Sequence, residues 1–180
     1  MNMPRLNTVT LETATGEAKE ILTAIDKKYG MVPNFFLGAA NSPAALASVV
    51  GLTTPLENGV LTPQEREVIT LTTSQLNDCD YCLGAHTAVA KMTGFSHEET
   101  LNIRRGKPSD AKHKALVDFV KAVIETKGKV SDTVLNNFRD AGFDDAAVAE
   151  VIATIAYKTF SNYFNRLNDT VMDFPSAGEI

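Results

Sequence analysis

Apolar residues recur at intervals of three and four along most of this chain, which is the spacing of one face of an α-helix. The first clear case joins Ala18, Ile21, Leu22, Ile25 and Tyr29, and Gly30 follows as a stop signal. No segment alternates apolar and polar residues with the period of two that a half-buried strand requires. The pattern therefore predicts an all-α protein.

Capping residues and glycines divide the periodic pattern into separate helices. Thr62, Pro63 and Glu65 form a strong start signal with a capping box, and Ser96 with Glu99 predicts a second capping box. Residues 1–14 show no helical period, so we expect them to run extended over the surface. In chain order we expect helices over residues 16–29, 43–57, 63–76, 78–94, 96–105, 109–127, 131–140 and 144–171, with a short helical or irregular piece at 32–37.

The predicted helix 144–171 has two apolar sides and little polar surface. One side is aliphatic, and the other carries alanines followed by aromatic residues. The two sets are Val148, Val151, Ile152 and Ile155, and Ala146, Ala149, Ala153, Ala156, Phe160 and Phe164. Only a narrow strip is polar, so neighbours must cover most of the helix; the strip comprises Glu150, Thr154, Lys158, Ser161 and Asn165. Covering both apolar sides usually takes a partner surface, so we expect a homo-oligomer, with a central helix in a monomer as the alternative.

Composition and charge narrow the class of protein. At 180 residues the chain can bury a proper core, and no linker-like stretch divides it, so we expect one domain over residues 1–180. A net charge of −5 without a dense basic tract argues against nucleic acid or an anionic membrane as the main partner. No apolar run approaches the length of a bilayer span, and no signal peptide opens the chain, so we expect a cytoplasmic protein.

Both cysteines of the chain lie in one short segment, residues 76–86, together with one of its three histidines. At the start of a helix, Cys79 and Cys82 are three positions apart and His86 is four beyond Cys82, so all three project from one side. A helix N-terminus offers free N–H groups and a partial positive charge, which favour the reactive thiolate. The segment is therefore a candidate reactive site.

Several interpretations of this group compete. In the first, Cys79 and Cys82 are simply small buried residues and His86 is a buried histidine with its hydrogen bonds made, so the group has no function. A metal site could use Cys79, Cys82 and His86, with Glu67 or water as the fourth ligand, because His97 and His113 are isolated and expected to be exposed. Dithiol redox chemistry would cycle the pair between thiols and a disulfide. A thioredoxin-like site is excluded because its motif follows a strand, and haem attachment needs a histidine directly after the second cysteine.

Two carboxylates in helix 63–76 have different expected roles. Glu65 has a sufficient structural explanation as the far half of the capping box with Thr62. Glu67 serves no cap, and it borders the apolar side of the helix next to Leu71. A carboxylate at such a position is costly unless it is paired, so Glu67 is a candidate partner of His86, with an edge carboxylate that reaches water as the alternative.

The segments 65–69 and 75–86 resemble the alkylhydroperoxidase D and carboxymuconolactone decarboxylase family, and the closing motif at residues 162–167 is similar to its branch of uncharacterised peroxidase-related proteins. The resemblance implies an all-α fold of paired helices, a trimer or hexamer, and thiol-dependent peroxidase activity. Hydroperoxide would be the substrate and an external dithiol or protein the reductant, with no cofactor. The decarboxylase branch lacks the cysteine pair, so the resemblance favours thiol chemistry over its lactone chemistry. The alternatives are that lactone chemistry, and a metal-binding or non-catalytic helical oligomer that uses Cys79, Cys82 and His86 as ligands.

Site roles follow from the same resemblance. Cys82 would be the deeper thiol that attacks the peroxide, and Cys79 the more accessible resolving thiol. Glu67 and His86 would form the proton relay. The better-known members can carry a histidine between the two cysteines, where this chain has Tyr81. A phenol with a pKa near 10 cannot act as a base near neutral pH, so the relay would depend on Glu67 and His86 alone.

Overall fold

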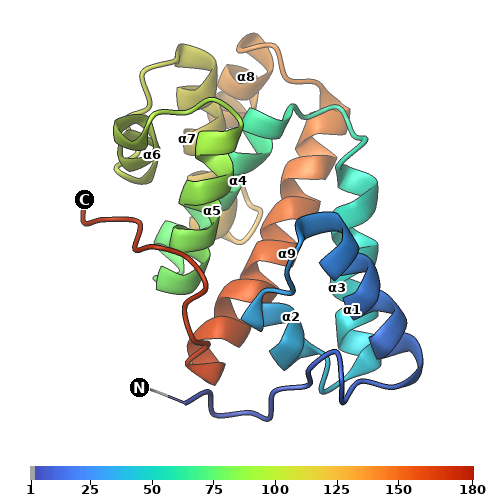
Figure 1. Ribbon diagram of the computed structural model, residues 1–180. Coiled ribbons are helices and arrows are strands. Elements are labelled where there is room, and N and C mark those ends of the chain that lie inside the picture. Colours follow the sequence, from blue (N-terminus) through green and yellow to red (C-terminus); the bar gives the residue numbers. More distant parts are fainter. Residues whose placement is uncertain (1–2) are drawn as a thin grey trace.

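A computed structural model describes residues 3–180 of the chain (Figure 1). Within these residues the chain forms nine α-helices and no strand, which confirms the all-α prediction. Residues 3–14 contain no helix, as expected, whereas residues 1 and 2 of the predicted extended segment lie outside the described part. The helices are α1 (Gly16–Tyr29), α2 (Asn34–Ala39), α3 (Pro43–Leu56), α4 (Pro63–Leu76), α5 (Asp80–Met92), α6 (His97–Arg104), α7 (Ala111–Thr126), α8 (Asp132–Asp140) and α9 (Asp145–Asn168).

Helices α4 and α9 form the centre of the molecule. Helix α4 packs against α5, α7 and α9, and α9 also contacts α2 and α3. Figure 1 shows α9 passing between α3 on one side and α5 on the other. The main apolar cluster joins α4, α5, α7, α8 and α9, and a second joins the N-terminal segment to α1, α2 and α3. A third, smaller cluster links α2 and α3 to α5 and contains both cysteines.

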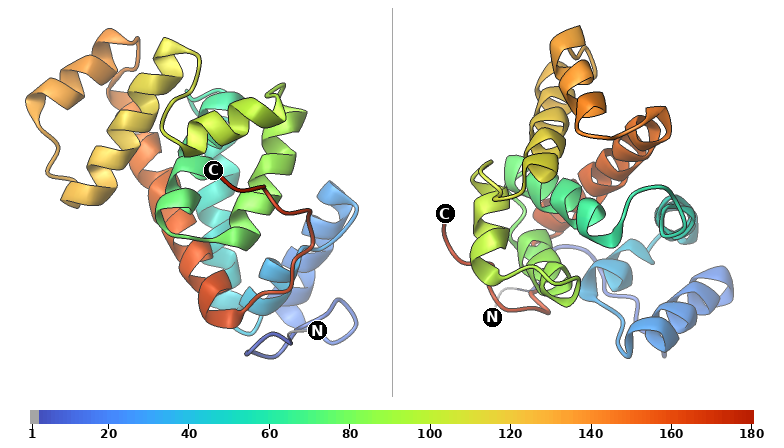
Figure 2. Two further views of the ribbon diagram at one scale, coloured as in Figure 1. Left: turned by 90° about the vertical axis from the view of Figure 1, so that its left-hand side faces the viewer. Right: turned by 90° about the horizontal axis from the view of Figure 1, so that it is seen from above.

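Aromatic stacking fixes α8 to the main cluster. Phe138 is fully buried, and its ring stacks on Phe119 of α7 at 4.2 Å and on Phe143 at 4.3 Å between centroids. Figure 2 shows α7 and α8 side by side at the end of the molecule away from α1. Both cysteines belong to the third cluster and not to the cluster that contains this stack, so we assign the stack a role in stability.

The two predicted capping boxes have different outcomes. At α4 the box is complete, because Glu65 N donates to Thr62 Oγ1 at 3.2 Å and Thr62 N donates to Glu65 Oε2 at 2.8 Å. At α6 only Ser96 caps the helix, accepting from Glu99 N. The second capping box is therefore wrong. The Glu99 carboxylate accepts instead from Ser109 N at 2.7 Å, which ties the loop before α7 to α6.

Two helix boundaries differ from the sequence prediction for reasons of backbone geometry. Helix α5 begins at Asp80 rather than near Asp78, because Asp78 has a φ of 50° and Cys79 is the N-cap. Helix α9 ends at Asn168 rather than at Val171, because Asp169 adopts a left-handed φ of 48°.

The segment after α9 returns across α5 toward α6 (Figures 1 and 2). A Cβ atom on Gly84 of α5 would lie 2.8 Å from the carbonyl oxygen of Pro175, so glycine is needed there for the close approach. Arg104 Nη1 donates to the carbonyl oxygens of Ala177 and Gly178 at 3.0 and 2.9 Å. These contacts hold residues 172–178, called the C-terminal strap below, against α5.

Helix α9 is covered only in part within the single chain, so the covering of both apolar sides that we expect from a partner copy stays a prediction. Its polar residues Thr154, Lys158, Ser161 and Asn165 are buried, because they point into the site described below. Each apolar side leaves a residue at the surface, with Ile152 of the aliphatic side 43% exposed and Phe160 of the other side 39% exposed. No helix in the described part of the chain is long and apolar enough to cross a membrane.

Candidate functional site

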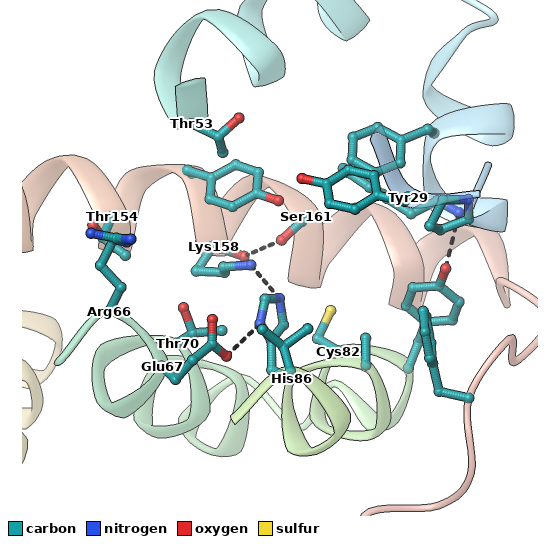
Figure 3. A pocket seen from close by; sticks show the side chains of 18 of the residues that line it. Tyr29, Thr53, Arg66, Glu67, Thr70, Cys82, His86, Thr154, Lys158 and Ser161 are labelled. Carbon is teal, nitrogen blue, oxygen red and sulfur yellow. Dashed lines mark hydrogen bonds and ion pairs between the residues drawn. The ribbon is translucent and has the colours of Figure 1, made fainter. Parts of the chain in front are cut away.

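Glu67 of α4 and His86 of α5 form a hydrogen-bonded pair (Figure 3). Glu67 Oε2 lies 2.8 Å from His86 Nδ1, and the two side chains are 11% and 20% exposed. A carboxylate only accepts hydrogen bonds, so the Nδ1 proton of the imidazole points at Glu67. Glu65, by contrast, serves the cap with Thr62 and pairs with Lys112 at 2.8 Å. The structure thus brings Glu67 to His86 and keeps Glu65 apart from them.

Cys79 and Cys82 are joined by a disulfide at the start of α5, with a Cα–Cα distance of 5.3 Å. Cys79 Sγ accepts a hydrogen bond from Cys82 N at 3.3 Å, as an N-cap side chain does. Both residues are buried, and Cys79 is only 1% exposed. The expectation that Cys79 is the more accessible of the two is therefore wrong for this disulfide form, in which both cysteines pack in the apolar cluster with Phe35 and Val49. Cys82, not Cys79, lines the cavity described below.

Lys158 of α9 occupies the other side of His86. Its Nζ lies 2.5 Å from His86 Nε2, and the residue is only 3% exposed. The ammonium also lies 4.3 Å from the centre of the Tyr157 ring, a cation–π distance. Burial lowers the pKa of Lys158 to about 7, with the Glu67 carboxylate opposing the shift. Lys158 can therefore be charged or neutral near physiological pH.

Both nitrogens of the His86 ring are engaged by these neighbours. Since Nδ1 donates to Glu67, Nε2 is the lone-pair nitrogen and accepts from Lys158. Burial and the nearby Lys158 charge lower the pKa of His86, while Glu67 opposes them. The geometry thus supports a neutral imidazole that connects the carboxylate to the amine.

Asn165 of α9 contacts the sulfur of Cys82. Its Nδ2 donates to Cys82 Sγ at 3.3 Å, and the residue is 4% exposed. One turn earlier, the buried Asn162 donates to Ser74 Oγ at 3.1 Å and accepts from Asn77 Nδ2 at 2.9 Å, which locks α9 onto α4. A hydrogen bond to sulfur is stronger when the sulfur is charged, so Asn165 can stabilise a Cys82 thiolate in the reduced protein.

A cavity of about 630 Å³ opens beside these groups. Figure 3 shows Glu67, His86 and Cys82 projecting from α4 and α5 toward Lys158, with Tyr29 and Thr53 on the opposite side. Most of the wall is apolar, and several of its side chains are aromatic: Phe35, Phe36, Tyr81, Tyr157 and Phe174. The volume is that of a pocket for a small organic molecule.

Tyr81 takes no part in the chain of groups around His86. Its hydroxyl donates to Asp173 Oδ2 of the C-terminal strap and accepts from Phe35 N at 3.3 Å. Burial, and then the Asp173 carboxylate, raise the pKa of Tyr81 above its ordinary value of 10.0. The phenol therefore stays protonated and holds the strap to α5, where Phe174 packs edge-on against its ring at 6.3 Å.

The remaining histidines lie outside this site. His97 is exposed as expected, whereas His113 is not, because its side chain is 14% exposed and packs against the Phe95 ring at 5.5 Å. Among the described residues no group of three or more His, Cys, Asp or Glu side chains is placed to hold a metal ion. Of the metal ligands considered from sequence, Cys79 and Cys82 are bonded to each other.

Sequence reasoning missed Lys158 and Asn165 as site residues. Both were assigned to the narrow polar strip of α9, at positions separated by seven residues. A polar strip on a helix whose other sides are apolar can face water or a polar cavity, and periodicity does not distinguish the two. The usable signal was that this strip is narrower than either apolar side, which is unusual for the exposed face of a helix.

Comparison with known proteins agrees with this fold. Residues 43–125 match the family model of the carboxymuconolactone decarboxylase family, and no protein with a curated description matches the chain. The alkylhydroperoxidase AhpD core of an uncharacterized peroxidase-related protein from Ralstonia eutropha JMP134 is similar, with a TM-score of 0.87 and 24% identity over 96% of this chain and 94% of that one.

Two other solved structures share the arrangement of helices. An uncharacterized peroxidase-related protein from Silicibacter sp. TM1040 has a TM-score of 0.81 and 22% identity, covering 99% of this chain and 98% of its own. The debrominase Bmp8 in complex with 2,3,4-tribromopyrrole has a TM-score of 0.79 and 16% identity, covering 96% and 93%. At these identities the likeness establishes the fold, which is AhpD-like.

Proposed function

We propose, because residues 43–125 match the model of the carboxymuconolactone decarboxylase family and the fold is AhpD-like, that this chain is a thiol-dependent peroxidase that reduces organic hydroperoxides. The observation that supports the proposal most is the placement of the Cys79–Cys82 pair. Cys82 lines an apolar cavity, and the buried Glu67–His86 pair lines the same cavity. A dithiol, a proton-carrying pair and an apolar pocket are the parts that such a reaction needs.

The cycle begins with the reduced protein. The Cys82 thiolate attacks one oxygen of the hydroperoxide, so that a sulfur–oxygen bond forms, the oxygen–oxygen bond breaks, and the alkoxide leaves with a proton as the alcohol. The Cys79 thiol then condenses with the sulfenic acid on Cys82, which forms the disulfide and releases water. An external dithiol or protein reductant takes the two oxidising equivalents and restores both thiols.

Three contacts favour Cys82 as the attacking thiol. Cys82 lines the cavity in which a substrate would bind, and Asn165 donates to its sulfur. His86 lies one helical turn beyond Cys82 and two turns beyond Cys79. Cys79 is bonded to Cys82 but does not line the cavity, so a ligand in the cavity would meet Cys82 and not Cys79.

Turnover of single-cysteine variants tests the function and the assignment together. With cumene hydroperoxide and dithiothreitol, the wild type should form cumyl alcohol catalytically. Without dithiothreitol, Cys82→Ser should consume no peroxide, whereas pre-reduced Cys79→Ser should react once and stop as a sulfenic acid on Cys82, which dimedone labelling and mass spectrometry would detect. Dimedone labelling of a sulfenic acid at Cys79 in the Cys82→Ser variant would instead make Cys79 the attacking thiol. A lactone decarboxylase, the alternative suggested by the family, would keep its activity in both variants.

A homo-oligomer, as a trimer or hexamer, is part of the proposal. The exposed side of α9 carries Ile152, Phe160, Tyr163 and Leu167, of which Tyr163 and Leu167 are 59% and 56% exposed. These residues repeat at helical spacing and form a continuous apolar stripe that a second copy could cover. Sedimentation velocity at micromolar concentration should show the oligomer, and Tyr163→Glu with Leu167→Glu should dissociate it. A monomeric wild type would contradict this part.

A cytoplasmic location fits the same chemistry. Reductants there return disulfides to thiols, and disulfides that do form are usually transient and catalytic. A Cys79–Cys82 pair in that compartment would rest in the reduced form and oxidise only on meeting a peroxide. Trapping the thiols with an alkylating agent in intact cells, before and after a peroxide pulse, would measure this directly.

Reductive dehalogenation of a small haloaromatic is a second candidate, favoured by the size of the cavity. The volume of about 630 Å³ exceeds what a small peroxide fills. The same dithiol can supply two electrons: the Cys82 thiolate takes the halogen as a positive fragment, the carbanion takes a proton, and Cys79 displaces halide to form the disulfide. Halide release from 2,3,4-tribromopyrrole, the molecule bound to the debrominase Bmp8, would support this candidate. Absence of bromide with rapid peroxide turnover would exclude it.

A further inference from the structure

His86 has no ring nitrogen left for a substrate. Its Nδ1 is 2.8 Å from Glu67 Oε2 and its Nε2 is 2.5 Å from Lys158 Nζ, so both polar atoms of the ring are occupied by protein groups. A general acid must lie within hydrogen-bond reach of the atom that receives the proton. If the protein reduces peroxides as proposed, some other group must deliver the proton to the leaving oxygen.

Lys158 has hydrogen-bond donors that the protein does not use. An ammonium has three N–H bonds, and within the described residues the one hydrogen-bond partner of Lys158 Nζ is His86. The residue is 3% exposed and lines the cavity, so its remaining donors face the cavity and not the outer surface of the protein. A buried donor without a partner is costly, and a ligand that accepts from it recovers that cost. Figure 3 shows the Lys158 side chain reaching from α9 to the His86 ring.

We propose that Lys158 is a catalytic residue that binds the leaving oxygen of the peroxide and protonates it as the oxygen–oxygen bond breaks. The Cys82 thiolate supplies the electron pair, the leaving alkoxide takes a proton from the ammonium, and the products are Cys82 sulfenic acid, an alcohol and a neutral Lys158 amine. When the external dithiol reopens the disulfide, one of its protons ends on Cys79 and the other returns to Lys158. His86 and Glu67, the proton-carrying pair of the proposed function, then act on the substrate only through Lys158: they hold the amine in place and do not touch the leaving oxygen.

The electrostatics of the site suit this role. Burial lowers the pKa of Lys158 to about 7, so the ammonium is both acidic enough to give its proton and basic enough to recover it near neutral pH. The negative charge of the Glu67 carboxylate opposes the lowering of the Lys158 pKa by burial. The aromatic wall around Phe35 and Tyr157 would receive the organic part of the peroxide.

Two peroxides with different leaving groups separate proton donation from a structural role. Cumene hydroperoxide releases an alkoxide, a strong base that needs a proton, whereas peroxybenzoic acid releases a carboxylate with a pKa of about 4, which does not. We would measure single-turnover oxidation of Cys82 at neutral pH in the wild type, Lys158→Met, Lys158→Arg and Lys91→Met. Lys91 is the matched control, because it is an exposed lysine on α5.

For cumene hydroperoxide, Lys158→Met should be slower by on the order of 10²-fold or more, the usual contribution of a general acid. Lys158→Arg should be nearly as slow, because a guanidinium keeps the charge but does not release a proton. Both variants should oxidise with peroxybenzoic acid at close to the wild-type rate, which also shows that they are folded, and Lys91→Met should match the wild type with both peroxides.

Equal losses with the two peroxides, or a wild-type rate for Lys158→Arg with cumene hydroperoxide, would overturn the role of Lys158 as the acid. Either result would leave the proposed peroxidase function standing, because the wild type would still react. A wild type that reacts with neither peroxide would instead refute the proposed function and this inference with it.

Discussion

Replacing Glu67 with glutamine removes one negative charge from the buried chain of groups at the site. The carboxylate accepts from His86 Nδ1 at 2.8 Å with only 11% of its side chain exposed. A hydrogen bond to a charged partner in such surroundings contributes about 1.5 to 3 kcal/mol, which corresponds to a roughly 10- to 150-fold change in rate. We therefore expect Glu67→Gln to slow Cys82 oxidation by alkyl hydroperoxide on the order of 10²-fold.

The pH profile gives a second signature of the same change. Glu67 is the group that holds the pKa of Lys158 up against the lowering effect of burial. Without the carboxylate that pKa falls further below about 7, so the amine is deprotonated at lower pH than in the wild type. If the ammonium is the acid, the high-pH loss of activity should begin at lower pH in Glu67→Gln.

Stopped-flow oxidation of Cys82 between pH 5 and 9 measures both effects, with Glu65→Gln as the matched control in the same helix. Glu65 serves the cap and the Lys112 ion pair, so its loss should cost about 0.5 to 2 kcal/mol of stability and leave the rate unchanged. Superimposable profiles for the wild type and Glu67→Gln would remove Glu67 from the mechanism. Equal slowing by both substitutions would mean that the loss is structural.

Three further predictions follow from packing and charge. Phe138→Ala should lower the free energy of unfolding in urea by about 3 to 5 kcal/mol, because the ring is fully buried; a variant as stable as the wild type would contradict that account of the stack. In a Cys79→Ser background, Asn165→Leu should move the midpoint of Cys82 alkylation to higher pH by about 1, since it removes a hydrogen bond to a charged sulfur worth about 1.5 kcal/mol, and an unchanged midpoint would show that the contact is not felt by the thiolate. Lys158 has a folded pKa near 7 and an ordinary value of 10.5, so between those values the unfolded chain binds a proton that the folded chain does not. The stability of the wild type relative to Lys158→Met should therefore rise with pH across that window, and a flat difference would contradict the lowered pKa.

Helix positions were predictable where a local signal starts or stops them. Thr62, Pro63 and Glu65 act within four residues, so the start of α4 could be assigned from the sequence alone. The box expected at Ser96 failed because Glu99 found a partner in a loop ten residues away. A tertiary contact of that kind competes with the local one and leaves no trace in helical spacing.

The candidate site was predictable to the extent that its residues share one helix. Cys79, Cys82 and His86 are ordered by the geometry of α5, and the paired state of Glu67 followed from its place beside an apolar side. Lys158 comes from α9 and reaches His86 across 72 positions of the chain. The polar strip of α9 faces the cavity because of the way α9 packs against α5. This packing cannot be predicted from the local sequence pattern.

The contact between Tyr81 and the C-terminal strap could not be predicted from the sequence either. Tyr81 stands where the resemblance suggested a possible histidine, and its hydroxyl meets Asp173, which was assigned to no element. The predicted extension of the last helix to Val171 failed because the backbone turns at Asp169. Because the helix ends there, the strap returns over α5. The Tyr81 phenol then holds the strap, which is a structural role and not a chemical one.

A count of thiols in the reduced protein, before and after one equivalent of cumene hydroperoxide, tests the central claim most directly. The sample is freed of reductant, its metal content is measured, and cumyl alcohol is quantified alongside the thiols. The account predicts that both thiols of the chain disappear, that one alcohol forms for each pair, and that no stoichiometric zinc is bound. Two thiols that still titrate after the peroxide, or one zinc ion per chain held by Cys79 and Cys82, would contradict it.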